Sequence, residues 1–142
     1  MKDDEISAQS PPVRSRTLSE TSGGFEITAV VYELGGDCLV ILYGGAKPHI
    51  GAVGMGQVRP SLADPEVISA TSSVFTYVGH KEDMVAKMAS EDLTRRLGRN
   101  TVVAAGIHWD NISPEGIKHV RTACRTLIDK IVSEVSRPEP HA

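Results

Sequence analysis

Residues Glu82 to Trp109 read EDMVAKMASEDLTRRLGRNTVVAAGIHW and contain a helix pattern followed directly by a strand pattern. Apolar residues recur every four positions from Val85 to Leu97, which predicts one apolar stripe of an α-helix. Gly98 is placed to end this helix. Residues 101–109 then form a continuous apolar run typical of a strand. Such a helix-to-strand connection is typical of proteins in which helices pack on a sheet.

The flanking segments extend this pattern on both sides. Ser113 and Pro114 predict a second helix start, an apolar stripe runs on to Val135, and Pro138 ends it. Upstream, four segments are rich in β-forming residues: 25–34, 38–44, 50–58 and 67–78. The prediction is an α+β fold of order ββββαβα, with two helices on a mixed, mainly antiparallel sheet. We expect one domain over residues 25–136, a flexible N-terminal tail over 1–24 and a C-terminal tail over 137–142.

Composition excludes several classes of function. The chain has 142 residues, of which 40% are hydrophobic and 23% charged, with a net charge of −3. This balance provides no basic face for nucleic acid, and no apolar run approaches the ~20 residues of a membrane span. The N-terminus lacks the apolar core of a secretory signal, so we expect a cytoplasmic protein. Cys38 and Cys124 are interpreted as reduced core thiols.

Strand direction suggests where a site would lie. If residues 38–44, 50–58 and 67–78 are successive antiparallel neighbours, the loops that carry His49, His80 and His108 meet at one edge of the sheet. Lys47 and Lys81 bring positive charge to the same edge, and both helices begin there. Helix N-termini and lysines favour an anion. The pattern therefore predicts a pocket for an anionic, partly aromatic small molecule, with Trp109 available for stacking.

Other interpretations of these residues stay open. The three histidines could instead bind a divalent metal ion such as zinc, with an open fourth position. Each histidine could also be only a turn residue, each lysine only a solvated charge, and Trp109 only a packing anchor. Arg59 and Ser61 belong to the opposite edge of the sheet, and could reach the pocket only across a dimer interface or if their loop folds back.

Three blocks in this order resemble a known family: GGAKPHIGAVGMGQVRPSL, SSVFTYVGHKED and NTVVAAGIHWDNIS. They are similar to the LpdD-like accessory proteins of UbiD-type aromatic-acid decarboxylases, over about residues 25 to 133. The resemblance implies a fold similar to that of proteasome assembly chaperones. It also implies a non-catalytic homodimeric chaperone that binds prenylated FMN and passes it to the decarboxylase, with a flavin prenyltransferase as a further partner.

The resemblance also implies which residues line or support the flavin site: His49, Gly51, Arg59, Ser61, His80, Lys81, His108 and Trp109. Lys47 joins them from the argument about charge at the edge. Two other functions remain as alternatives. One is a structural subunit that stabilises a decarboxylase complex by protein contacts alone. The other is a small metalloprotein built on His49, His80 and His108.

Overall fold

The computed structural model describes residues 13–79 and 82–135. Its elements are β1 (Arg14–Ser22), β2 (Phe25–Leu34), β3 (Asp37–Gly45), β4 (Ala52–Pro60), β5 (Ile68–Thr76), α1 (Asp83–Leu97), β6 (Thr101–His108) and α2 (Pro114–Val135). From residue 25 onward, the predicted order ββββαβα is confirmed. The two helix ends follow the sequence signals. Gly98 ends α1 in the left-handed conformation, and the Ser113 hydroxyl accepts a hydrogen bond from the backbone of Gly116 at the start of α2.

All six strands belong to one sheet, in the order β1-β2-β3-β6-β4-β5. Only β3 and β6 are parallel to each other, and the other neighbouring pairs are antiparallel. The predicted mixed, mainly antiparallel sheet is therefore confirmed. The expectation that β3, β4 and β5 are successive neighbours is wrong, because β6 inserts between β3 and β4. The strand that takes the central place is a nearly continuous run of small and β-branched apolar residues.

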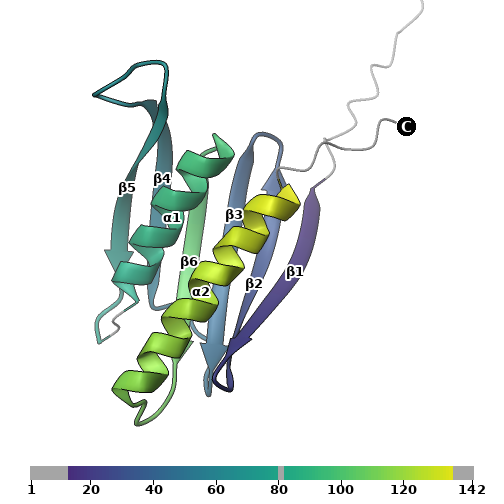
Figure 1. The fold of residues 1–142 in the computed structure, drawn as a ribbon, viewed down its shortest axis with the longest axis vertical. Coiled ribbons are helices and arrows are strands. Elements are labelled where there is room, and N and C mark those ends of the chain that lie inside the picture. Colours follow the sequence, from purple (N-terminus) through teal and green to yellow (C-terminus); the bar gives the residue numbers. More distant parts are fainter. Residues whose placement is uncertain (1–12, 80–81, 136–142) are drawn as a thin grey trace, which may run out of the picture.

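The expected convergence at one edge survives this change of order. Since β4 is antiparallel to β6 and β6 is parallel to β3, the strands β3, β5 and β6 all run in one direction and β4 in the other. The ends of β3, β5 and β6 and the start of β4 therefore meet at a single edge, which we call the histidine edge. Both helices begin on this side of the molecule (Figure 1).

Strand β1 corrects the prediction of a tail over residues 1–24. Its sequence, RSRTLSETS, has one apolar residue, Leu18, and therefore no alternation to indicate a strand. The segment is ordered by its partners instead. It pairs with β2 along its whole length, Leu18 packs on the core, and Glu20 forms an ion pair with Lys130 of α2. The first twelve residues of the predicted tail lie outside the described residues.

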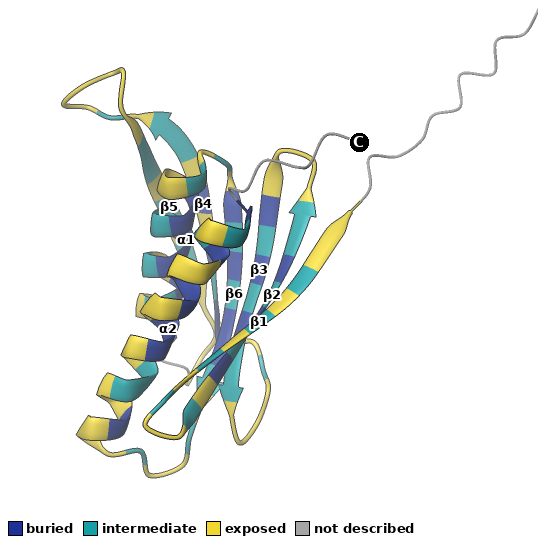
Figure 2. Cartoon of the chain, turned by 45° about the vertical axis from the view of Figure 1, so that its right-hand side comes forward, coloured by how far each residue is buried: buried dark blue, intermediate teal, exposed yellow. Residues whose placement is uncertain are grey.

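Both helices lie on the same face of the sheet, α1 over β4, β5 and β6, and α2 over β1 and β2 (Figure 1). Along the central strands, buried residues alternate with more exposed ones (Figure 2). Cys38 and Cys124 are both buried here without a disulfide, as predicted, and burial raises the pKa of the Cys124 thiol to about 11. No helix among the described residues is long and apolar enough to cross a bilayer.

Helix α1 comes unusually close to β4. A Cβ atom on Gly54 would lie 2.5 Å from the Ser90 hydroxyl and even closer to the Ala86 carbonyl. A Cβ atom on Gly56 would overlap Thr94 in the same way. The two glycines therefore form a track on which the backbone of α1 rests directly on the strand.

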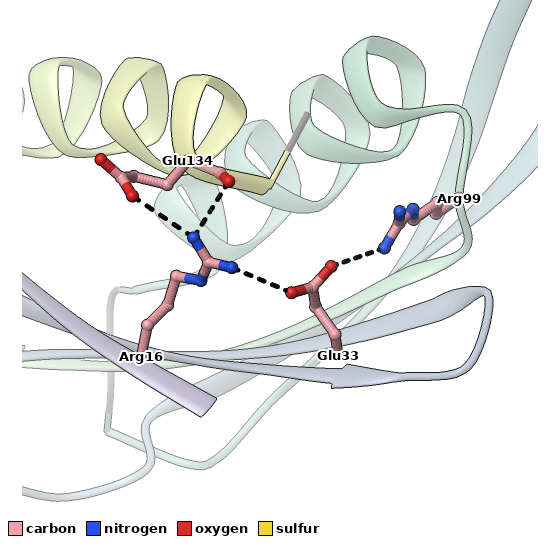
Figure 3. A network of polar contacts seen from close by, with 4 residues as sticks. All are labelled: Arg16, Glu33, Arg99 and Glu134. Atoms are coloured by element: carbon pink, nitrogen blue, oxygen red, sulfur yellow. Dashed lines mark hydrogen bonds and ion pairs between the residues drawn. The ribbon is translucent and has the colours of Figure 1, made fainter. Parts of the chain in front are cut away.

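A polar network ties the last turn of α2 to the sheet (Figure 3). Arg16 of β1 donates to the Glu134 carbonyl at 2.9 Å and to Glu33 of β2 at 3.2 Å. Arg99, in the turn after α1, donates to the other Glu33 oxygen at 2.9 Å. Since the Glu33 side chain is only 13% exposed and each arginine 31%, the network is largely shielded from water. Glu33 thereby joins three separate parts of the fold.

We expect Glu33→Ala to lower the free energy of unfolding by about 2 kcal/mol, because two half-buried guanidinium groups lose their shared acceptor. Glu33→Gln keeps one acceptor oxygen and should lose less. Asp129→Ala is the matched control: Asp129 also pairs with an arginine, but its side chain is 66% exposed, and we expect a loss within about 0.5 kcal/mol. Urea denaturation measures all three. Equal losses for Glu33→Ala and Asp129→Ala would contradict a structural role for the network.

Candidate functional site

The histidine edge carries the two described histidines of the predicted set. His49 lies in the connection between β3 and β4, and His108 is the last residue of β6. This connection has to cross the end of β6, because β6 lies between the strands it joins. Ala46 donates a hydrogen bond to the His108 carbonyl at 2.9 Å, and Gly51 donates one to the Ala105 carbonyl at 2.8 Å. The segment 46–51 is therefore fastened to β6 at both ends.

Two glycines make this crossing possible. A Cβ atom on Gly106 would overlap the His49 carbonyl, and a Cβ atom on Gly51 would overlap the Glu82 carboxylate. Glycines in such places can allow a ligand to approach the backbone closely. At these two positions, other atoms of the protein occupy the space beside the glycine. Gly51 therefore supports the site by packing and does not face an open cavity.

Glu82 also lies at the histidine edge, although it is not among the predicted site residues. It immediately precedes α1 and is 7% exposed. Its Oε1 atom lies 2.7 Å from His49 Nε2 and 3.4 Å from the backbone nitrogen of Ile107. Because β4 begins only at Ala52 while β6 runs on to His108, Glu82 occupies the place where a strand neighbour would accept a hydrogen bond from the backbone of Ile107. Glu82 and His49 are 33 residues apart in the chain, so the sequence order alone does not reveal that they form a pair.

The surroundings of His49 determine its charge. Nδ1 lies 2.9 Å from the Lys47 carbonyl, which can only accept a hydrogen bond. Nε2 faces the Glu82 carboxylate, which accepts as well when ionised. The Lys47 carbonyl raises the pKa of His49 most, partial burial opposes it, and the hydrogen bond and charge of Glu82 raise it further. Protonation of both ring nitrogens lets His49 donate to both acceptors, and the raised pKa of His49 favours this imidazolium form.

This ion pair makes stability depend on pH. A histidine with a raised folded-state pKa stabilises the fold fully below its unfolded value near 6.5, and the contribution disappears as pH rises through the folded value. We expect His49→Gln to cost about 1 kcal/mol more at pH 6 than at pH 9, measured by urea denaturation. In a Glu82→Gln background this difference should shrink. A difference that grows toward high pH would contradict the imidazolium assignment.

His108 and Lys47 are the accessible polar groups of the predicted set at this edge. Half of the His108 side chain is exposed, and its Nε2 atom lies 2.9 Å from Asp110 Oδ1. Lys47 is exposed in the crossing segment. His80 and Lys81, the other predicted residues of this edge, lie outside the described residues. A polar or anionic ligand can therefore reach Lys47 and the pair of His108 and Asp110.

Trp109 is half-buried and packs against the protein at this edge. Its ring packs edge-on against Phe25 with centroids 5.1 Å apart, and it lies against the core near Gly44. The alternation of β6 explains this placement: Trp109 continues the series of Val103 and Ala105, which faces the helices, while His108 faces the other side. The contacts expected of a packing anchor are present, and the stacking of Trp109 on a ligand stays a prediction.

Arg59 and Ser61 lie at the opposite edge of the sheet, as expected for a single copy of the chain. Arg59 lies near the end of β4 and donates to the Thr71 hydroxyl at 2.6 Å. The Ser61 hydroxyl accepts from the backbone of Ala63 at 3.2 Å, within the β4–β5 connection. Their loop does not fold back to the histidine edge (Figure 1). Within one chain the predicted flavin residues therefore divide between two ends of the sheet.

The start of α1 is a less favourable site for an anion than predicted. The buried Glu82 carboxylate and Asp83 stand at the start of α1, so the electrostatic environment there is acidic. A surface depression of about 770 Å³ lies elsewhere, lined by residues of α1, α2 and the start of β5. Positive charge at the edge therefore has to come from lysine side chains more than from the start of α1.

The metal alternative gains no support from the described residues. None of them form a cluster of three histidine, cysteine or acidic side chains arranged for a metal ion. His49 also has both ring nitrogens in hydrogen bonds, to Lys47 and to Glu82. A metal at His49 would first have to break the pair with Glu82.

The fold and this edge together define a two-layer α+β module whose loops gather at one end of its sheet. A model of the prenylated flavin chaperone LpdD-like domain matches residues 21–136. The protein LpdD of Lactiplantibacillus plantarum is 25% identical over 117 residues, which cover 82% of each chain. A solved structure of a chaperone complex for yeast 20S proteasome assembly matches with a TM-score of 0.49 and 14% identity, over 88% of this chain and 98% of that one.

The chain belongs to the LpdD-like prenylated flavin chaperone family, since the family model covers most of its length. The resemblance drawn from the three sequence blocks is thereby confirmed.

Proposed function

We propose that this protein is a non-catalytic chaperone that binds prenylated FMN and delivers it to a UbiD-type aromatic-acid decarboxylase. The observation that carries the proposal is the match of residues 21–136 to the prenylated flavin chaperone family. The alignment with LpdD covers 82% of each chain, so the similarity extends over the folded domain. The flavin prenyltransferase that makes the cofactor is the proposed donor, and the decarboxylase is the proposed acceptor.

The histidine edge is the proposed place for the cofactor within one chain. Lys47 supplies a flexible positive charge for the phosphate, and exposed His108 supplies a polar contact for the ring edge. His49 acts indirectly, since its ring is held by Lys47 and Glu82 and fixes the crossing segment beside the ligand. Protein atoms already occupy the space beside Gly51 and Gly106, so the ligand would bind on the outer surface of the histidine edge. Arg59 and Ser61 can contribute only from a second copy of the chain.

The experiment is co-expression with a flavin prenyltransferase, followed by a visible spectrum and a mass spectrum of the purified protein. We expect a bound species heavier than FMN in the wild type and a clear loss of it in the double variant Lys47→Ala, His108→Ala. Lys118→Ala is the matched control, because it removes an exposed lysine from α2. A wild-type protein with no bound flavin under these conditions would overturn the proposal.

A structural subunit that acts by protein contacts alone is the second candidate. The observation that favours it is the apolar sheet face opposite the helices, on which Met55 and Phe75 are 52% and 60% exposed. Co-purification with the decarboxylase separates the two functions. If the Lys47→Ala, His108→Ala protein still binds and fully activates the decarboxylase, contacts alone are sufficient. If it binds but leaves the enzyme without cofactor, delivery is the function.

A further inference from the structure

Helix α2 carries a stripe of three basic residues on its exposed side. Lys118, Arg121 and Arg125 are three and four positions apart, so they lie along one side of the helix. All three are exposed. The exposed side of α2 is turned away from the sheet (Figure 2). Since the whole chain has a net charge of −3, this concentration of positive charge is a local feature.

The basic residues of α2 differ from those of α1 because no acid neutralises them. On α1, Lys87 pairs with Glu91, and Arg95 and Arg96 both pair with Asp92. Within the part of the chain that the structure describes, the three charged groups of the α2 stripe form no ion pair and no hydrogen bond. Their positive charge is therefore directed to solvent.

The position of Asp129 accounts for the missing partner of Arg125. Asp129 lies four residues after Arg125, at the spacing of a usual ion pair on a helix. It pairs instead with Arg96 of α1, at 2.7 Å, and so links the two helices. Arg125 therefore keeps its charge for a group outside the described chain.

The depression of about 770 Å³ adds apolar surface beside this stripe. Arg125 belongs to its lining, together with Met84 and Met88 of α1 and Ile128 of α2. Met84 is 70% exposed, so this lining is open to solvent. The acids of the lining are already paired with cations of α1: Glu91, Asp92 and Asp129. Arg125 therefore supplies the charge that a partner would meet here.

An open, partly apolar surface beside unpaired cations fits a protein segment better than a small molecule. A small-molecule site encloses about 70–90% of its ligand, which a surface as open as this one cannot do. An amphipathic helix, in contrast, places only its apolar side in such a depression. Its acidic side would then meet Arg121 and Arg125, since opposite charges orient the partner. The matching occupant is an acidic, amphipathic segment.

This surface begins close to the histidine edge. Both helices start at that edge (Figure 1). Met84 is the second residue of α1 and Lys118 the fifth of α2, so each lies within about 6 Å of its helix start along the axis. A protein bound here would therefore reach the edge at which the cofactor is proposed to bind.

We propose that this surface docks an acidic, amphipathic segment of the acceptor decarboxylase. We call it the basic face and define it by six residues: Met84, Met88, Lys118, Arg121, Arg125 and Ile128. The inference rests on the proposed function, because its partner is the enzyme that receives the cofactor. It gives the two tasks of the chaperone to two surfaces, since the histidine edge holds the cofactor and the basic face holds the enzyme.

The first test is the affinity for a UbiD-type decarboxylase purified without cofactor, measured by biolayer interferometry at about 50 mM and about 300 mM NaCl. The wild-type Kd should rise several-fold with salt, because salt screens exposed charges. Arg121→Ala, Arg125→Ala should raise the Kd at least tenfold at low salt and reduce its salt dependence. Thr126→Glu, Ser133→Glu is the matched control. It changes the net charge by the same amount at exposed positions of α2 outside the basic face, and should bind like the wild type.

The second test concerns the apolar part of the basic face. Met84→Glu places a negative charge where the partner is expected to be apolar and acidic, and should raise the Kd at least tenfold. Leu62→Glu is its matched control, because Leu62 lies in the β4–β5 connection at the opposite edge of the sheet. Since Met84 and Leu62 are 70% and 93% exposed, both variants should fold. Leu62→Glu should leave the Kd unchanged.

Two results would overturn the inference. One is an arginine variant that binds the decarboxylase as tightly as the wild type does. The other is an equal loss of affinity in Thr126→Glu, Ser133→Glu, because net charge alone would then explain the effect.

Flavin content, measured on the same proteins, separates this inference from the proposed function. The arginine variant should carry as much prenylated FMN as the wild type and fail to deliver it. If the variant lost the flavin but still bound the enzyme, the arginines would hold the cofactor phosphate and the docking proposal would be wrong. A wild type that binds the enzyme through the basic face but carries no flavin contradicts only the proposed function.

Discussion

Gly106→Ala is expected to destabilise the protein by about 3 kcal/mol, although it adds a single methyl group. The added Cβ would overlap the His49 carbonyl, which is backbone and cannot rotate away. Relief requires the crossing segment 46–51 to lift from β6 and break its hydrogen bonds to Ala105 and His108. The substitution should therefore detach the segment that carries Lys47 and His49.

Urea denaturation measures the loss of stability, and hydrogen exchange shows where it occurs. The amides of Ala46 and Gly51 should lose protection before those of the strands β2 and β3. Gly36→Ala is the control, because no atom lies within 4 Å of the place its new methyl group would take and its backbone is not in the left-handed region. That variant should be neutral or slightly stabilising. If Gly106→Ala proved as stable as Gly36→Ala, the close crossing over β6 would be wrong.

Gly54→Ala should have an effect of similar size, about 3 kcal/mol, through a different element. Its Cβ would press against the Ala86 carbonyl and the Ser90 hydroxyl, so the backbone of α1 would have to move away from β4. Because α1 begins directly after Glu82, this movement should also strain the contact between Glu82 and His49.

Gly54→Ala and Gly106→Ala should differ in which part of the protein loses protection from hydrogen exchange. Hydrogen exchange should show lost protection in the middle of α1, around Ser90, while the amide of Gly51 stays protected longer. Gly36→Ala serves again as the control. Unchanged stability and unchanged protection of α1 would contradict the direct contact of the helix backbone with β4.

Local sequence patterns predicted most of the elements, because the core depends on apolar periodicity. The stripe from Val85 to Leu97 and the run at residues 101–108 both correspond to observed elements. Strand β1 escaped this reasoning, since Leu18 is its single apolar residue and its order comes from pairing with β2 and ion pairs with α2. Partners far away in the chain leave no local periodicity.

Strand order was also beyond local patterns. A six-residue connection such as 46–51 is compatible with a simple hairpin, and the sequence around it does not state that β6 will enter between its strands. The crossing does require glycine at two positions of the sequence: Gly51, where a Cβ would overlap Glu82, and Gly106, where it would overlap His49. The placement of His49 and His108 at the histidine edge was nevertheless predicted correctly, because it depends on strand direction and not on which strands are neighbours.

Side-chain orientation explains the remaining differences at the candidate site. Alternation along β6 could have placed Trp109 on the helix side with Val103 and Ala105, and His108 on the other. The role of Glu82 could not be found in this way. It depends on β4 starting at Ala52 while β6 continues, a mismatch in strand length that appears only in three dimensions.

The central position of β6 has a consequence for how the chain acquires its structure. β1, β2 and β3 can pair as a meander, and β4 and β5 as a hairpin, but the two pieces share no edge until β6 lies between them. During synthesis on the ribosome, the edges of β3 and β4 that pair with β6 therefore stay unpaired until residues 101–108 emerge. Closing such long-range pairs is a slow step in folding. The joining of these two half-sheets by β6 is accordingly the step at which we expect nascent chains to be most prone to aggregate.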